Sequence, residues 1–320
     1  MRYICTYFDK NYLPRGLALI ESLERYSNEF ICYILALDKY TFDYLSGLEK
    51  SYIIPISIEE YGQYFTLEKL KYKDKKEFFF SLTPGFCLYL LKNREEVDLL
   101  LYLDADVCLF NNIEYLYDEI GPSSIAICPH RLPIFMKLFS TNYGVYNVGV
   151  NAFRKDATGI RCLEDWHHDC SNWHQGMPGY SLSFFSDQIW LDSWPDKYPN
   201  LKIIDHIGID TAPWNAINYK FKKIDNTYFV NNRPLIIYHF ASIKKIDNNV
   251  WTGNTGSLLI NINNILLEIY QNYIVKIDLD NDLKSAELDV TGSRIKKIIY
   301  FLAKIFFNDK IYLDHKCEKS

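Results

Sequence analysis

Two aspartates separated by one residue, Asp104 and Asp106, follow directly after an apolar run at 99–103. The run has the composition of a buried central strand. Residues i and i+2 of an extended segment point to the same side, so the two carboxylates should stand close together where the strand ends. Such a pair favours a shared divalent cation, which completes its shell with phosphates and water. The spacing therefore predicts a metal site at the carboxyl edge of a sheet, where ligands of open α/β sheets bind.

The spacing occurs a second time in an acidic segment at 278–282. There Leu283 stands where a calcium-binding loop needs Gly for its sharp turn. We interpret that segment as a solvated acidic loop. The apolar run before Asp104 and the helix-like material around it distinguish the first pair.

The first 110 residues alternate between short apolar segments and amphipathic segments, which predicts strands at 3–7, 32–37 and 52–56 and helices at 14–26 and 41–50. A further helix at 78–91 precedes the strand that ends at Asp104. This alternation predicts an α/β fold with a mostly parallel sheet flanked by helices. Later segments suggest strands at 147–153 and 234–240, helices at 163–170 and 186–194, and a loop at 171–183.

Composition excludes several classes of protein. A net charge of -5 without a basic stripe interleaved with aromatics in the first 250 residues argues against nucleic-acid binding. The eight cysteines are scattered singly and lack a CxxC pair, which is typical of buried thiols in a reducing compartment. The start of the chain has no signal-peptide pattern, and no uncharged run is long enough to span a bilayer. We therefore expect a cytoplasmic protein.

The composition shifts to Ile, Asn and Lys from about residue 254, and we expect a domain at 1–250 followed by an extension at 251–320. Within the extension, 294–307 reads as a basic amphipathic helix. Such a helix can lie on the inner face of an anionic membrane. It can equally dock on its own domain, and the sequence leaves both interpretations open.

Four separated motifs together resemble one family: Leu-Tyr-Leu-Asp-Ala-Asp at 101–106, Asn-Val-Gly at 147–149, Asp-Gln at 187–188 and Tyr-His-Phe at 238–240. They resemble the metal-dependent glycosyltransferases of the GT-A fold, and most closely the retaining family 8 group that includes bacterial lipopolysaccharide glycosyltransferases and glycogenin. The resemblance covers approximately residues 1–250. It implies a GT-A domain with a small C-terminal helical extension. It also implies transfer of a hexose from a UDP-sugar to a hydroxyl of a glycan or lipid-linked acceptor, such as a lipopolysaccharide precursor.

The resemblance implies a metal site formed by Asp104, Asp106 and His239, with Mn²⁺ or Mg²⁺ as the cofactor, and Asp104 would also face the nucleotide sugar. A divalent ion there would neutralise the diphosphate that leaves. Lys245, six residues after His239, would bind phosphate. Alternatively, His239 is a satisfied core histidine and Lys245 a solvated surface residue.

Further positions match the family segments that hold the donor. Asn147 and Asn151 would bind sugar hydroxyls, Asp187 would grip the sugar, and Gln188 would lie below the anomeric carbon. The alternatives are a strand bulge for the asparagines and a helix-dipole partner for Asp187.

The end of the first strand lies where this fold holds the nucleotide, so Thr6, Tyr7 and Asp9 are candidates to contact it, with Tyr7 available to the base. Asp38 is another acid at a strand end. The Trp-Asn pair at 214–215 resembles a family segment on the acceptor side, and a structural turn is its alternative.

Three departures from the family pattern leave the donor sugar and the anomeric outcome open. The helix at 81–91 lacks the usual Arg, Ile189 replaces the third acid of Asp-Gln-Asp, and Ala-Ser-Ile at 241–243 replaces a Gly-rich run.

Two rival functions remain. An aspartyl-nucleophile phosphatase also places Asp-x-Asp after an apolar strand, but normally after the first one. A non-catalytic relative that binds a nucleotide sugar is the other, and retention of both aspartates and His239 argues against it.

Overall fold

The computed structural model describes residues 1–64, 75–137, 144–172, 186–247, 250–253, 262–278 and 310–312. The chain forms two compact units. The first contains residues 1–10, 27–105 and 114–205, and the second contains 11–26, 106–113 and the chain from 206 onward. The chain passes from the first unit to the second between Ala105 and Asp106.

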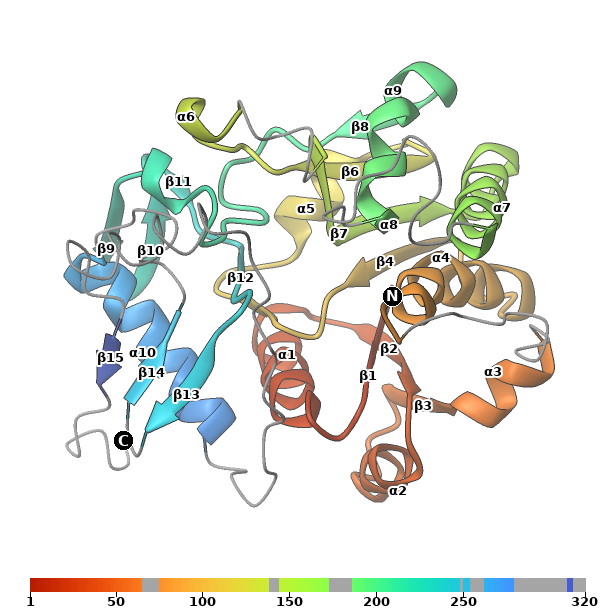
Figure 1. The fold of residues 1–320 in the computed structure, drawn as a ribbon, viewed down its shortest axis with the longest axis horizontal. Coiled ribbons are helices and arrows are strands. Elements are labelled where there is room, and N and C mark those ends of the chain that lie inside the picture. The colour runs from red at the N-terminus through yellow and green to blue at the C-terminus, as the bar shows by residue number, and fades with distance from the viewer. Residues whose placement is uncertain are drawn as a thin grey trace, which may run out of the picture. The chain divides into compact units, whose positions relative to one another are not determined.

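The first unit is built on a seven-stranded sheet in the order β3-β2-β1-β4-β7-β6-β8 (Figure 1). Its strands are β1 (Arg2–Phe8), β2 (Phe30–Ala36), β3 (Ile53–Ser57), β4 (Leu99–Leu103), β6 (Ile125–Pro129), β7 (Tyr146–Arg154) and β8 (Leu201–Ile203). Every neighbouring pair is parallel except the two that include β7. The predicted mostly parallel α/β sheet is thus confirmed. Because β7 runs opposite to β4 and β6, its first residues lie at the edge where those two strands end.

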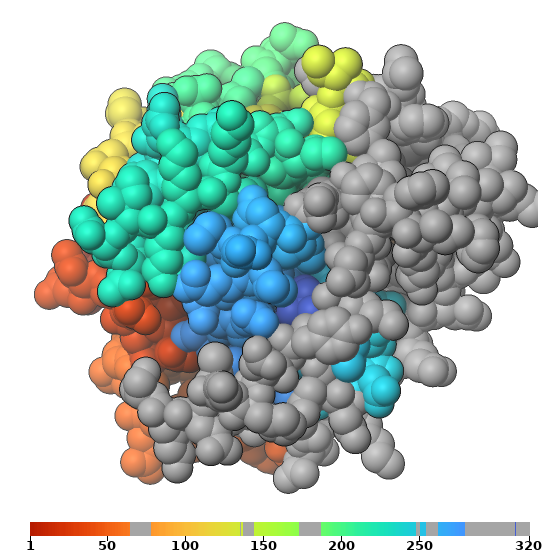
Figure 2. Space-filling view, turned by 90° about the vertical axis from the view of Figure 1, so that its left-hand side faces the viewer, coloured from red at the N-terminus to blue at the C-terminus, as the bar shows by residue number. Residues whose placement is uncertain are grey.

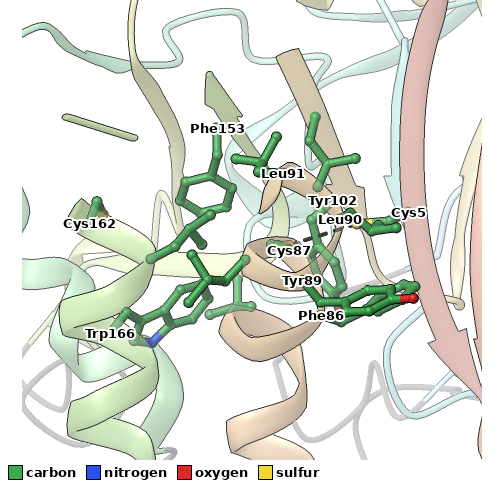
Figure 3. Packing of buried hydrophobic residues seen from close by; sticks show 14 of the residues in the cluster. Cys5, Phe86, Cys87, Tyr89, Leu90, Leu91, Tyr102, Phe153, Cys162 and Trp166 are labelled. Atoms are coloured by element: carbon green, nitrogen blue, oxygen red, sulfur yellow. Dashed lines mark hydrogen bonds between the residues drawn. The ribbon is translucent and has the colours of Figure 1, made fainter. Parts of the chain in front are cut away.

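The helices of the first unit are α2 (Lys39–Gly47), α3 (Ile58–Tyr64), α4 (Lys75–Asn93), α5 (Glu114–Ile120), α6 (Ile134–Lys137), α7 (Ala157–Asn172), α8 (Ser186–Ile189) and α9 (Trp194–Lys197). The α4 helix packs beside α7 (Figure 1). Residues 81–91 of α4 are all buried, as expected for a helix that is apolar on every side. Figure 3 shows Phe86 and Leu90 of this helix in one cluster with Phe153 of β7 and Trp166 of α7. Each fully buried side chain of this size contributes about 1.5–3 kcal/mol.

In its described residues, the second unit contains α1 (Leu13–Tyr26), α10 (Asn264–Asp278), a 3₁₀ turn (Ala216–Asn218) and three small sheets. These sheets pair β5 (Val107–Leu109) with β12 (Ile237–His239), β9 (Phe221–Ile224) with β10 (Thr227–Val230) and β11 (Arg233–Pro234), and β13 (Lys244–Asp247) with β14 (Val250–Thr252) and β15 (Lys310–Tyr312). The core forms against α10, where the Phe240 ring stacks on Tyr273 at 3.8 Å. Figure 2 shows α10 in blue, with teal residues of the β9–β11 sheet bordering it.

Several elements differ from the sequence expectations. The predicted helix at 186–194 is divided into α8, a 3₁₀ turn (Trp190–Ser193) and α9, whose first turn contains Pro195. Proline removes a backbone donor, so a helix begins again there more easily than it continues. The sheet formed by β13, β14 and β15 was not predicted. In the predicted loop at 171–183, the first two residues end α7.

Several expectations fall on residues outside the described part of the chain: the rest of that loop, the acidic positions from 280 to 289 and the amphipathic helix at 294–307. The boundary at residue 250 stays a prediction. Among the described helices, none combines the length and the apolar composition needed to cross a bilayer.

Candidate functional site

Strand β12 carries His239 between two acidic segments of the second unit. Val107 of β5 lies opposite His239, and the carbonyl of Asp106 accepts the N–H of the residue after His239 at 2.8 Å. On the other side of β12, the N–H of His239 donates to the carbonyl of Thr211 at 2.8 Å. Asp106 precedes Val107 in the chain, and Asp210 precedes Thr211. This register therefore places the two aspartates on opposite sides of His239.

Asp106 meets the imidazole directly. Its Oδ1 lies 3.0 Å from Nε2 of His239, which is 4% exposed. Burial raises the pKa of Asp106, but the attraction and hydrogen bond of His239, together with the positive charge of Arg15, hold that pKa below its usual value. Asp106 is therefore ionised at neutral pH and available to a cation.

Asp104 continues the first unit's sheet where β4 ends. Its N–H donates to the carbonyl of Gly149 in β7 at 2.9 Å. The hydroxyl of Tyr102 donates to Oδ1 of Asp104 at 2.7 Å, which fixes the orientation of this half-buried carboxylate. Only Ala105 separates Asp104 from Asp106 in the chain.

Asp104, Asp106 and His239 each offer one ligand atom, and these three atoms all lie within 4.8 Å of one another. An ion with bonds of about 2.1 Å holds neighbouring ligands about 3 Å apart, so the donors need only a small inward movement to share one. Two carboxylates and one imidazole suit Mn²⁺ and Mg²⁺, with coordination positions left for phosphate and water. The three predicted ligands are thus brought together, and their chemistry fits a divalent cation.

Asp187 lies in the first turn of the short α8. Its Oδ1 accepts the N–H of Gln188 at 2.9 Å, and its carbonyl accepts the indole N–H of Trp166 at 2.9 Å. Burial, and then the negative charge of Asp104, raise the pKa of Asp187 to about 7. The half-buried Asp187 carboxylate is therefore close enough to Asp104 for the two negative charges to repel each other, as expected if both contribute to one site. Gln188 is buried at 8% exposure.

Asn147 is held by the protein itself. Its Oδ1 accepts the N–H of Gly149 at 2.7 Å, and its Nδ2 lies 3.3 Å from Nε2 of His130. The other ring nitrogen of His130 lies 3.1 Å from the carbonyl of Gly144. Since His130 follows directly after β6, the structure places an imidazole beside the predicted sugar-binding amide.

Asn151 and Thr6 each keep one polar atom without a partner among the described residues. Asn151 is 1% exposed, and its Nδ2 donates to the carbonyl of Val148 at 2.8 Å while Oδ1 remains unpaired. Thr6 is fully buried, and its Oγ1 is unpaired. A buried polar group without a hydrogen bond costs about 1–3 kcal/mol, so a water or ligand atom at either position would be stabilising.

Tyr7, one of the predicted nucleotide contacts of the first strand, has structural partners. The Tyr7 hydroxyl donates to the carbonyl of Phe79 at 3.2 Å and lies 3.2 Å from Oγ1 of Thr83. Burial raises the pKa of Tyr7, so it stays a neutral phenol. Asp9 is half-buried. Asp38 is the N-cap of α2 and accepts the N–H of Thr41 at 3.0 Å, which explains an acid at that strand end.

Lys245 forms an ion pair with Asp278 at 2.7 Å and lies over the ring of Trp251 at 5.8 Å. Its predicted contact with phosphate stays a prediction. The Trp214 ring contacts His239 edge-on at 5.1 Å, and Asn215 is fully buried. The segment that the resemblance assigned to the acceptor side thus also lies against the imidazole.

Sequence reasoning missed Asp210, His130 and Arg15. His130 follows an apolar strand just as Asp104 does, so its position after 125–128 was a usable signal. Asp210 and Arg15 do not follow an apolar strand, so the sequence had no comparable pattern for them. Asp210 lies in a short irregular segment, and Arg15 lies on the surface of α1. The guanidinium of Arg15 donates to the carbonyl of Ile243 at 2.9 Å.

Comparison with known proteins gives low sequence identities. No family model matches the chain. Two uncharacterized proteins of Bacillus subtilis (strain 168) are similar to it. YfnD is 21% identical over 240 residues, covering 75% of this chain and 77% of that protein, and YfnF is 25% identical over 252 residues, covering 77% and 82%.

Solved structures similar to this one include glycosyltransferases. The galactosyltransferase LgtC, in complex with donor and acceptor sugar analogs, has a TM-score of 0.49 and 16% identity, covering 75% of this chain and 87% of that chain. Mouse xyloside xylosyltransferase 1 has a TM-score of 0.47 and 13% identity, covering 75% and 98%.

Proposed function

We propose that this chain is a metal-dependent glycosyltransferase of the GT-A type that transfers a hexose from a UDP-sugar to a hydroxyl group. The observation that carries the proposal is that the neighbouring Asp104 and Asp106 and the distant His239 offer ligand atoms that lie within 4.8 Å of one another. The pKa of Asp187, raised by burial and by Asp104, supports a second group that acts at the same place. An ion held by the three donors would neutralise the diphosphate as it leaves.

The remaining roles are assigned to the chain's own residues. Asp187 and Gln188 would hold the sugar near its anomeric carbon, and Asn151 would accept a sugar hydroxyl through its unpaired Oδ1. Thr6, Tyr7 and Asp9 would contact the nucleoside. Lys245 would exchange its partner Asp278 for phosphate. Holding the donor in one orientation lowers the barrier because the acceptor then attacks within a single complex.

The acceptor in this proposal is a cell-surface glycan or a lipid-linked precursor, and the anomeric configuration is retained. Cytoplasmic action, with contact to the inner face of the membrane through 294–307, belongs to the same proposal. The acceptor and the retention of configuration follow from the resemblance in sequence, and the location follows from the cysteine usage and the basic amphipathic pattern at 294–307. Product analysis by NMR would test the anomeric outcome.

Release of UDP from a set of UDP-sugars tests the reaction, measured with Mn²⁺ and with EDTA. We expect slow hydrolysis with Mn²⁺ and none with EDTA, together with a metal-dependent rise in the thermal midpoint for the preferred donor. Hydrolysis of p-nitrophenyl phosphate without any nucleotide sugar would instead support the aspartyl phosphatase. Donor-dependent stabilisation without turnover, even with acceptors supplied, would support a non-catalytic relative.

A further inference from the structure

We propose that Asp210 is a positioning residue that fixes the His239 ring so that Nε2 faces the cation. The inference rests on the metal-dependent function proposed above and adds a residue that the sequence motifs did not contain.

The position of Asp210 is unusual for a carboxylate. Its side chain is fully buried, its Oδ1 lies 3.4 Å from Nδ1 of His239, and its Oδ2 has no hydrogen-bond partner among the described residues. Burying a carboxylate costs several kcal/mol unless a partner compensates it. The imidazole of His239 is the ion-pair partner that the structure gives Asp210. Orientation of the His239 ring is the clearest explanation for a carboxylate that is buried at such a cost.

The backbone at Asp210 is held in place as well. Its φ of +58° lies in the left-handed region, which Asp adopts more readily than most residues but still at a cost. Asn215 braces the turn, since its Nδ2 donates to the carbonyl of Asp210 at 3.0 Å and its Oδ1 accepts the N–H of Ala212 at 2.9 Å. The turn therefore presents the carboxylate to His239 from a fixed position.

The two nitrogens of the His239 ring face two different acids. Nδ1 lies beside Asp210, and Nε2 lies 3.0 Å from Asp106, one of the proposed metal ligands. When Nδ1–H donates to a carboxylate, Nε2 carries the free electron pair that a cation needs, and such outer partners orient histidine ligands. The Trp214 ring, edge-on at 5.1 Å, limits rotation of the imidazole. Without a cation, both ring nitrogens face a carboxylate; a cation that replaces the Nε2–H contact to Asp106 would leave the proton on Nδ1 beside Asp210 and keep the ring in this orientation.

Mn²⁺ binding to the full chain tests this inference, with free Mn²⁺ measured by electron paramagnetic resonance. Asp210→Asn keeps the size of the side chain and tolerates the left-handed backbone, yet removes the negative charge. We expect its Mn²⁺ affinity to fall about 10–100-fold. Asp225→Asn is the matched control, because Asp225 is exposed and has a φ of +46° in the β9–β10 turn. It should bind Mn²⁺ as the wild type does.

A double-mutant cycle with His239→Gln shows whether Asp210 acts through the ring. If it does, Asp210→Asn costs no further affinity once His239 is replaced, whereas a general disturbance of folding would cost the same in both backgrounds. Wild-type affinity in folded Asp210→Asn would overturn the inference and leave the proposed function standing. An equal loss in both backgrounds would also overturn it. Absence of Mn²⁺ binding to the wild type would overturn the inference and the proposed function together.

Discussion

Asp106 and Asp187 are both half-buried aspartates near strand or helix ends, yet their surroundings shift their acidities in opposite directions. Asp106 in the second unit faces His239 and the charge of Arg15, and its pKa lies below the ordinary value. Asp187 in the first unit faces the like charge of Asp104, and its pKa is raised to about 7. Burial opposes ionisation in both cases, so the sign of the neighbouring charge decides the outcome.

The opposite shifts suit Asp106 and Asp187 to two different roles. A carboxylate that stays charged suits a cation ligand, whereas one that is about half protonated at pH 7 can both donate hydrogen bonds to sugar hydroxyls and accept them. A bound cation beside Asp104 would also lower the pKa of Asp187, because it offsets the like charge. The environment therefore separates two identical residue types into two roles.

The largest expected effect comes from Asp106→Asn. Removing a charged metal ligand should lower Mn²⁺-dependent UDP release by about 10³-fold, which corresponds to about 4 kcal/mol of barrier. Far-ultraviolet circular dichroism should remain unchanged, and Asp225→Asn serves as the control. Full activity in folded Asp106→Asn would contradict the role of Asp106 as a metal ligand and its contrast with Asp187.

Asp187 should give a pH-dependent stability with a defined sign. Between its ordinary pKa of 3.8 and about 7, the folded protein binds this proton more tightly than the unfolded chain does, so stability falls as pH rises. Asp187→Asn removes that loss, and in metal-free protein it should raise the free energy of unfolding at pH 8 by about 1–4 kcal/mol. Urea unfolding at pH 4 and pH 8 measures the difference.

At pH 4 the variant and the wild type should agree. Saturating Mn²⁺ should shrink the gap at pH 8, because the cation favours the charged form of the wild type. A gap that is independent of pH would mean that Asp187 is not held near neutrality.

His130→Ala tests whether Asn147 depends on the protein for its orientation. The change leaves the buried Nδ2 of Asn147 without the imidazole and should cost about 1–3 kcal/mol of stability. The Michaelis constant for the donor should rise if Asn147 binds the sugar. His168→Ala, at an exposed position of α7, is the control. A stable variant with an unchanged Michaelis constant would indicate that donor binding does not depend on the contact between His130 and Asn147.

The smallest effect is expected at Asp38. As the N-cap of α2 it should contribute about 1 kcal/mol, so Asp38→Ala should lower the thermal midpoint without changing the rate of UDP release. Differential scanning fluorimetry and the UDP assay measure the two quantities. A change in donor affinity would instead place Asp38 in contact with the nucleotide and extend the site along the sheet edge.

The confirmed parts of the fold are those in which local pattern and tertiary environment agree. The alternation of apolar and amphipathic segments predicted β1 to β4 and their helices, because each segment carries its own periodicity. The helix predicted at 186–194 is broken because Pro195 outweighs the apolar pattern around it. The antiparallel direction of β7 had no local signal, because strand direction depends on the connection and not on the strand itself.

The sequence by itself determined which residues could do chemistry: an acidic pair after a buried strand, a late histidine, and an Asp-Gln pair opening a helix. It determined these because residue type and spacing suffice to specify ligand chemistry and the ends of elements. Only the tertiary structure decided that Asp210 lies beside His239, that His130 holds Asn147 and that Asp187 senses Asp104. Those relations depend on strand register and on packing between segments far apart in the chain, and proximity of that kind leaves no periodic trace in the sequence.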